Sequence, residues 1–142
     1  MRMVAPARAG GKPAIALLVE ADEADRERYG AWLEGAGIGV INCPGPKRDD
    51  FTCLGVRGER CGLVEIADLA ILDVRLLDDA YRPATGSRRL LHYYLNSGKP
   101  IVLVGSLDRS ERRIRDDQVA LVRRPSARSL VSAVRRLLQA TG

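Results

Sequence analysis

Five short apolar runs, separated by segments with a different periodicity, place the tightest limits on how this chain can fold. The runs cover residues 14–20, 38–42, 69–73, 100–106 and 119–122. A continuous apolar run of this length is typical of a strand that is buried on both faces of a parallel sheet. The segments 24–37, 87–98, 108–118 and 126–139 carry helical spacing or helix-start signals. This alternation predicts an α/β fold, with a doubly wound, five-stranded parallel sheet that helices cover on both faces.

One segment interrupts this alternation. Residues 43–62 lie where the second helix is expected, but they contain two prolines, several glycines and no apolar period. Proline and glycine both oppose helix propagation, so we expect a Cys/Gly/Pro-rich loop to replace most of that helix. We expect residues 1–13 to be a basic, frayed tail and residues 14–142 to form a single domain.

Composition and charge narrow the choice of environment and partner. The longest apolar runs are far too short to cross a bilayer, and no apolar segment of a signal peptide follows Arg2, so we expect a cytoplasmic protein that does not associate with membranes. The net charge is +5. Residues 109–142 hold nine arginines but no aromatic residue, which predicts a solvated basic face or a docking surface for an acidic protein. Nucleic acid is a weaker candidate partner, because bases would find no stacking platform there.

Polar side chains follow four of the predicted strands. Glu20 and Asp22 follow the first, Asp73 ends the third, Ser106 follows the fourth, and Arg124 follows the fifth. The carboxyl ends of parallel strands meet at one edge of a doubly wound sheet, where ligands bind. A carboxylate cluster with a nearby cation at such an edge is suited to metal-assisted chemistry on a phosphoryl group.

These strand ends resemble those of the response-regulator receiver domain, the CheY-like fold, over residues 14–140. The stretch LLVEAD is similar to the acidic turn after the first strand of that family, and LAILDV to the strand that ends in the phosphoacceptor aspartate. The stretches PIVLVGS and LVRRPS are similar to the strands that carry the switch hydroxyl and the Lys-Pro pair. The resemblance implies a strand order of 2-1-3-4-5, with Asp73 at the phosphoacceptor position and Glu20 as the first metal-binding acid.

The chain departs from the receiver pattern at several positions. The second acid is replaced by Ala21, with Asp22 one position further along, and the switch position is Gly105, with Ser106 displaced by one. Arg124 stands where the family has lysine, and Arg75 lies two residues after Asp73. Magnesium is disfavoured because one carboxylate is missing and two cations are added. A guanidinium paired with Asp73 is the favoured arrangement; true phosphorylation, or a purely structural Asp73, are the alternatives.

All three cysteines fall in or beside the irregular segment. The spacing of Cys43, Cys53 and Cys61 lacks the C-x2-C pair that is typical of zinc sites. Their clustering leaves three alternatives: reduced structural thiols, a site for zinc or another metal, and a disulfide or redox pair. We expect the three cysteines to act together.

The function that these features favour is that of a stand-alone, atypical (pseudo-) receiver, a non-enzymatic module that signals through contact with a protein partner or a second copy. A metal- or thiol-based sensor that uses the cysteine loop is the first alternative. A flavodoxin-like binder of small molecules is the second, and the absence of a Gly-rich phosphate loop before a helix weakens it.

Overall fold

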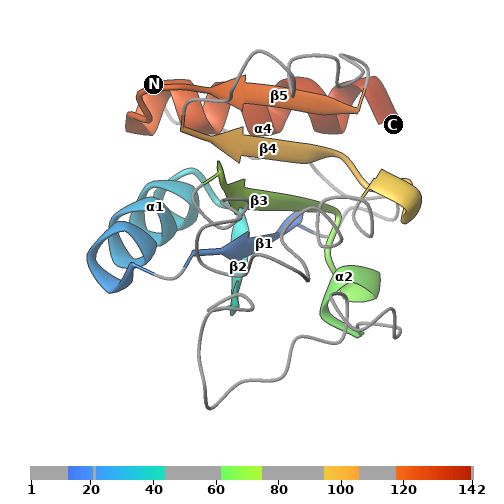
Figure 1. Ribbon diagram of the computed structural model, residues 1–142, viewed down its shortest axis with the longest axis horizontal. Helices are drawn as coiled ribbons and strands as arrows, with labels where there is room; N and C mark the ends of the chain where they lie inside the picture. Colours follow the sequence, from blue (N-terminus) through green and yellow to red (C-terminus); the bar gives the residue numbers. More distant parts are fainter. Residues whose placement is uncertain (1–12, 21, 44–61, 75–94, 106–117, 142) are drawn as a thin grey trace, which may run out of the picture.

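The structure, a computed structural model, describes residues 13–20, 22–43, 62–74, 95–105 and 118–141. Its core is a five-stranded sheet in the order β2-β1-β3-β4-β5 (Figure 1). All four neighbouring strand pairs are parallel, so the predicted fold class and strand order are confirmed. The strands are β1 (Ile15–Val19), β2 (Gly39–Cys43), β3 (Leu69–Asp73), β4 (Ile101–Val104) and β5 (Val119–Val122).

Three helices are described in full. They are α1 (Glu23–Gly35), α2 (Gly62–Ile66) and α4 (Ala127–Thr141). Helix α4 begins at the predicted cap, Ser126, whose Oγ accepts a 3.0 Å hydrogen bond from the Ser129 N–H. A further helix, of which Leu95 and Asn96 are described, ends as predicted at Gly98, where φ is +75°.

The pleat of the sheet divides the core into two layers. Alternate residues of β1, Ala16 and Leu18, face the layer that α1 and α4 cover with Leu33 and Leu130. The intervening Leu17 and Val19 face the opposite layer, which contains Val64 of α2 and is bordered by Leu95. Both faces are therefore apolar, which explains why the strands appear in the sequence as unbroken hydrophobic runs.

The amino ends of β1 and β3 are fixed by a reciprocal pair of hydrogen bonds. The Ile15 N–H donates to Oδ2 of Asp68 at 2.7 Å, and the Asp68 N–H donates to the Ile15 carbonyl at 2.8 Å. Residue Val19 then stands opposite Leu72. This register brings Glu20, which directly follows β1, level with the end of β3.

The expected loop over residues 43–62 is only partly visible. Cys43 belongs to β2 and Gly62 begins α2, whereas residues 44–61 lie outside the described part of the chain, as do residues 1–12 of the predicted tail over residues 1–13. Helix α2 has five residues, and its single turn was not predicted. Within the described residues, no helix combines the length and the apolar character that crossing a membrane requires.

Candidate functional site

Two buried carboxylates lie side by side at the carboxyl edge of the sheet. Glu20 is 2% exposed and Asp73 is 4% exposed. The β1–β3 register places them on adjacent strands, as the sequence predicted. Burying two acids is costly unless hydrogen bonds or cations offset the loss of water. This buried pair therefore identifies the carboxyl edge of the sheet as the candidate functional site.

Asp22 was predicted to belong to this pocket but does not. It is the exposed N-cap of α1, and its Oδ1 accepts a 2.9 Å hydrogen bond from the Asp25 N–H. Its own N–H donates to Oε1 of Glu20 at 3.0 Å. An aspartate is a favoured N-cap because its side chain accepts a hydrogen bond from an unpaired N–H of the first turn. Asp22 therefore positions α1 and supports Glu20.

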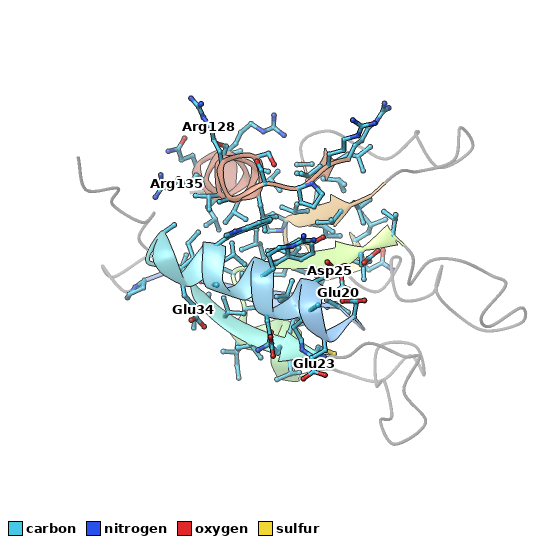
Figure 2. All side chains as sticks on the ribbon, turned by 90° about the vertical axis from the view of Figure 1, so that its left-hand side faces the viewer. Glu20, Glu23, Asp25, Glu34, Arg128 and Arg135 are labelled. Atoms are coloured by element: carbon cyan, nitrogen blue, oxygen red, sulfur yellow. The ribbon has the colours of Figure 1, made fainter. Side chains whose placement is uncertain are left out.

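Asp25 takes the place in the pocket that was expected of Asp22. Carboxylate oxygens of Glu20, Asp25 and Asp73 all lie within 4.8 Å of one another. Asp25 is the third residue of α1, and Figure 2 shows it beside Glu20 where the helix begins. The strand-end pattern in the sequence did not point to this residue. The sequence signal that could have identified it is the N-cap residue Asp22. A helix that begins after Asp22 places Asp25 in its first turn, next to the edge of the sheet.

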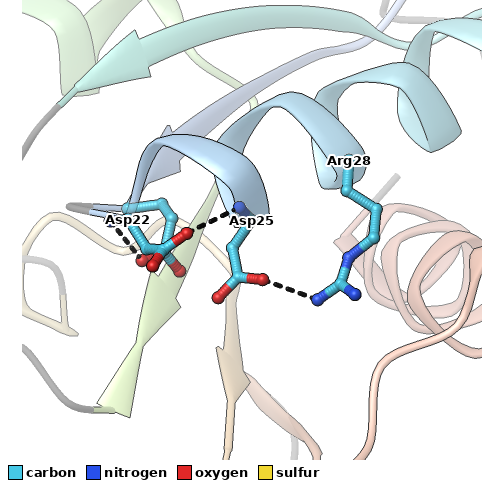
Figure 3. Close-up of polar contacts among 4 residues, drawn as sticks. Asp22, Asp25 and Arg28 are labelled. Atoms are coloured by element: carbon cyan, nitrogen blue, oxygen red, sulfur yellow. Dashed lines mark hydrogen bonds and ion pairs between the residues drawn. The ribbon is translucent and has the colours of Figure 1, made fainter.

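A cation from α1 adjoins the three acids. Nη2 of Arg28 lies 2.6 Å from Oδ1 of Asp25 (Figure 3). The same guanidinium stands over the rings of Tyr29 and Trp32, at 5.3 and 5.4 Å from their centroids. The two rings contact each other with centroids 5.5 Å apart. The aromatic pair thus holds the guanidinium beside Asp25 through cation–π attraction.

Of the two cations that the sequence predicted for this pocket, only Arg124 lies in the described part of the chain. Arg124 is exposed. Within the described residues the ion pair at this edge joins Arg28 to Asp25, and Arg124 is not paired with Asp73. Arg75 lies outside the described residues, as does Ser106. Two described cations therefore adjoin this edge of the sheet: Arg28, which is paired with Asp25, and Arg26, whose Nη1 donates a 3.3 Å hydrogen bond to the Glu20 carbonyl. The sequence pattern singled out neither.

The end of β4 has no room for a side chain at the switch position. Gly105 has a φ of +120°, a conformation that favours glycine. A Cβ built there would collide with Cγ2 of Val74, the residue after Asp73. A serine or threonine at position 105 would therefore require both a strained backbone and a displaced Val74.

Cys43 is the one cysteine in the described part of the chain. It is a buried thiol in the layer that α2 covers, and its carbonyl accepts a 3.0 Å hydrogen bond from the Glu20 N–H. Among the described residues, the one group of potential metal ligands is Glu20, Asp25 and Asp73, which does not include Cys43. Cys53 and Cys61 lie outside the described residues, so joint action of the three cysteines stays a prediction.

The pocket has the donor chemistry of a site for a hard divalent cation. Three carboxylates offer the oxygen ligands that Mg²⁺ takes in proteins, and Glu20, Asp25 and Asp73 are the residues that would hold it. Arg28 competes with such an ion, because its guanidinium already neutralises one of the three acids. A cation of the chain's own therefore offsets one of the three negative charges of the site.

No model of a known protein family matches the chain, and no curated protein matches its sequence. Solved structures do match. A response regulator receiver protein from Sinorhizobium medicae shares 17% identity, with a TM-score of 0.60 over 92% of this chain and 98% of its own. The chemotaxis protein CheY4 of Vibrio cholerae also shares 17% identity, with a TM-score of 0.59 over 88% and 98% of the two chains.

A designed protein shows how far this likeness extends. A de novo designed Rossmann 2x3 fold protein matches with a TM-score of 0.55 at 17% identity, over 91% of both chains. A backbone of this type therefore exists without any natural activity, and a shared fold does not fix a function. At these identities the comparisons establish that the chain has the CheY-like fold of receiver domains.

Proposed function

We propose that the chain is an atypical, receiver-like signalling module that acts through protein contact and does not use conventional Mg²⁺-dependent phosphorylation of Asp73. In this proposal it is a cytoplasmic protein and not an enzyme. Three features of the carboxyl edge support it: Ala21 at the place of an acid, Gly105 at the switch position, and Arg28 beside Asp25.

The conformation of Gly105 carries the most weight. A phosphoryl group on Asp73 adds negative charge and three acceptor oxygens, and a conformational response needs a nearby donor that reports on it. A hydroxyl-bearing side chain at position 105 is opposed by the φ of +120° and by Val74. The pocket therefore lacks at this position the group that would couple a modified Asp73 to the rest of β4.

The deciding experiment treats the purified protein with acetyl phosphate and Mg²⁺ and measures intact mass. We expect no substantial species that is heavier by one phosphoryl group. A species that forms in the wild type and disappears in Asp73→Asn would overturn the proposal. The matched control is Asp68→Asn, which alters another aspartate of the β1–β3 region, at the amino edge.

A second function is favoured by one observation, the position of Asp25. If Asp25 supplied the metal ligand that Ala21 cannot, Asp73 would be phosphorylated in a pocket with rearranged ligands. The same assay separates the two functions. Phosphorylation that is lost in Asp25→Ala, kept in Asp22→Ala and abolished by a chelator would establish this second function.

A further inference from the structure

A hollow lies between the end of α1 and the start of α4. It has a volume of about 930 Å³, and its apolar wall consists of Trp32 and Ala36 from α1 and of Ala127 and Val131 from α4. Trp32 is the single tryptophan of the chain and is partly exposed. Tryptophan is enriched among the residues that dominate binding energy at protein interfaces. The hollow is therefore suited to receive an apolar side chain of a partner.

Two arginines of α4 follow one edge of this hollow. Arg128 lines it directly. Arg135 comes seven residues later, so it lies within about 20° of Arg128 around the helix and about 10 Å from it along the axis. Val131 is at a level about midway between them. Figure 2 shows both arginines on the outer side of α4, away from the sheet. We call them the arginine pair.

The arginine pair has no counter-charge in the described part of the chain. Neither residue takes part in an ion pair there, and Nε and Nη2 of Arg135 are buried without a hydrogen-bond partner. Leaving buried donors unpaired costs free energy. That cost is relieved when the flexible side chain turns toward a carboxylate from outside, so the arginine pair is suited to an acidic ligand.

The charges around the arginine pair have one sign. Residues 118–142 contain five arginines and no aspartate or glutamate. No acid in the first turn of α4 offsets the positive end of its helix dipole. Glu34 contributes to the lining of the hollow, but Figure 2 shows it on the side of α1 that faces away from α4. An approaching acidic group is therefore attracted along the whole α4 side of the hollow.

We propose that the hollow and the arginine pair dock an acidic, amphipathic helix of another protein. An apolar side chain of that helix fills the hollow against Trp32 and Val131. Two carboxylates seven residues apart pair with Arg128 and Arg135, because charges two turns apart on one helix match charges two turns apart on another. An apolar centre with a charged margin is the usual anatomy of a protein interface.

The apolar wall favours a protein helix over a nucleic acid. Phosphates would also pair with the arginines, but a nucleic acid has no aliphatic side chains to place against Ala36, Ala127 and Val131. Single strands are bound by stacking successive bases on several aromatic rings, and Trp32 is the one ring among the described residues that line the hollow. The inference rests on the proposed action through protein contact and adds the chemistry of the partner.

The test titrates the full chain with a synthetic helical peptide that has glutamates seven residues apart, leucines between them and no tryptophan. The fluorescence of Trp32 reports binding directly, because the chain has no other tryptophan. We expect a saturable change, with an affinity that falls as salt rises. A peptide with lysine in place of each glutamate, and one with serine in place of each leucine, should each bind at least about tenfold more weakly.

Substitutions in the chain locate the binding site. Arg128→Glu and Arg135→Glu should each lower the affinity at least about tenfold. Ala127→Glu should do the same by placing a charge in the apolar wall, while thermal unfolding shows no loss of stability, since an acid suits the first turn of a helix. The matched control is Arg136→Glu, which makes the same charge change about 80–100° further around α4; we expect less than a twofold effect.

Three results would overturn the proposal. They are no saturable binding of the glutamate peptide, equal effects of Arg128→Glu and Arg136→Glu, and tighter binding of a mixed-sequence oligonucleotide that the same substitutions weaken. The acetyl phosphate assay is independent of all three. If the peptide fails to bind and Asp73 stays unmodified, only the docking inference fails; if the peptide binds and Asp73 is phosphorylated, the docking site stands and the proposed function is revised.

Discussion

Arg28 and Asp25 form an ion pair within the first two turns of α1, with Nη2 and Oδ1 2.6 Å apart. Asp25 also belongs to the carboxylate pocket, and Arg28 also stacks on Tyr29 and Trp32. The pair therefore connects the pocket at the sheet edge to the aromatic contacts between α1 and the core. Because the Arg28 side chain is 53% exposed, the pair itself adds little stability. The main effect of the ion pair is to make the carboxylate pocket less negative, because Arg28 neutralises Asp25.

The first prediction concerns that charge. Arg28→Gln removes the guanidinium that neutralises Asp25 and leaves the pocket more negative by one unit. We expect the affinity for Mg²⁺ or Mn²⁺ to rise about tenfold, because a divalent cation no longer competes with a fixed positive charge. Isothermal titration calorimetry measures the change.

The control for this prediction is Arg124→Gln. Arg124 is exposed and is not paired with Asp73 in the described part of the chain, so we expect its removal to leave cation affinity within about twofold. Equal effects of the two substitutions would show that general charge, and not the Asp25 contact, sets the affinity.

The second prediction concerns Gly105. We expect Gly105→Ala to lower the free energy of unfolding by about 2–4 kcal/mol, because it adds backbone strain to a collision with Val74. The cost should be smaller in a Val74→Ala background, where the colliding methyl groups are absent, although the strain of the positive φ remains. Denaturant unfolding of the four proteins in the cycle measures the coupling. An equal cost in both backgrounds would exclude the contact.

The sheet was predictable because its physics is local to each strand. Strands that are buried on both faces need continuous apolar runs, and the observed bounds of β3 and β5 coincide with the predicted ones. Helix α2 was not predicted, because a single turn of five residues is too short to display a helical period. Packing of Val64 against the sheet, which depends on the tertiary structure, stabilises it.

The pocket was only half predictable for a different reason. Strand ends are fixed by register, so Glu20 and Asp73 could be placed from the sequence. Asp22 and Asp25 are the same residue type, and which of them faces the pocket depends on where α1 begins and how it is rotated. The capping hydrogen bond from the Asp25 N–H to Asp22 decides this. The same rotation brings Arg28 to the pocket in place of the predicted Arg124.

The third prediction tests the cap of α4. The hydrogen bonds are reciprocal: Ser126 Oγ accepts from the Ser129 N–H at 3.0 Å, and the Ser126 N–H donates to Ser129 Oγ at 2.8 Å. We expect Ser126→Ala to lower the free energy of unfolding by about 1 kcal/mol, since it leaves an N–H of the first turn unpaired. Ser132→Ala, at an exposed position inside the same helix, should change it by less than about 0.5 kcal/mol. Thermal or urea unfolding, followed by circular dichroism, compares the two.

The fourth prediction concerns Tyr29, whose burial in the core raises the pKa of its phenol above 10.0. A hydrogen bond from Arg28 lowers this pKa in part, and the charges of Asp25 and Glu20 add to the increase. The unfolded chain has an ordinary tyrosine, with a pKa of about 10, so between the two values the unfolded state releases a proton that the folded state keeps. The contribution of Tyr29 to stability is therefore complete below about pH 10 and is lost as the pH rises through the folded pKa.

We expect the free energy of unfolding of the wild type to fall more steeply than that of Tyr29→Phe between about pH 9.5 and 11.5, as measured by urea titrations at each pH. Lysine and the remaining tyrosines titrate alike in both proteins, so the difference between the two curves isolates Tyr29. Parallel curves would mean that the Tyr29 hydroxyl reaches water in the folded state.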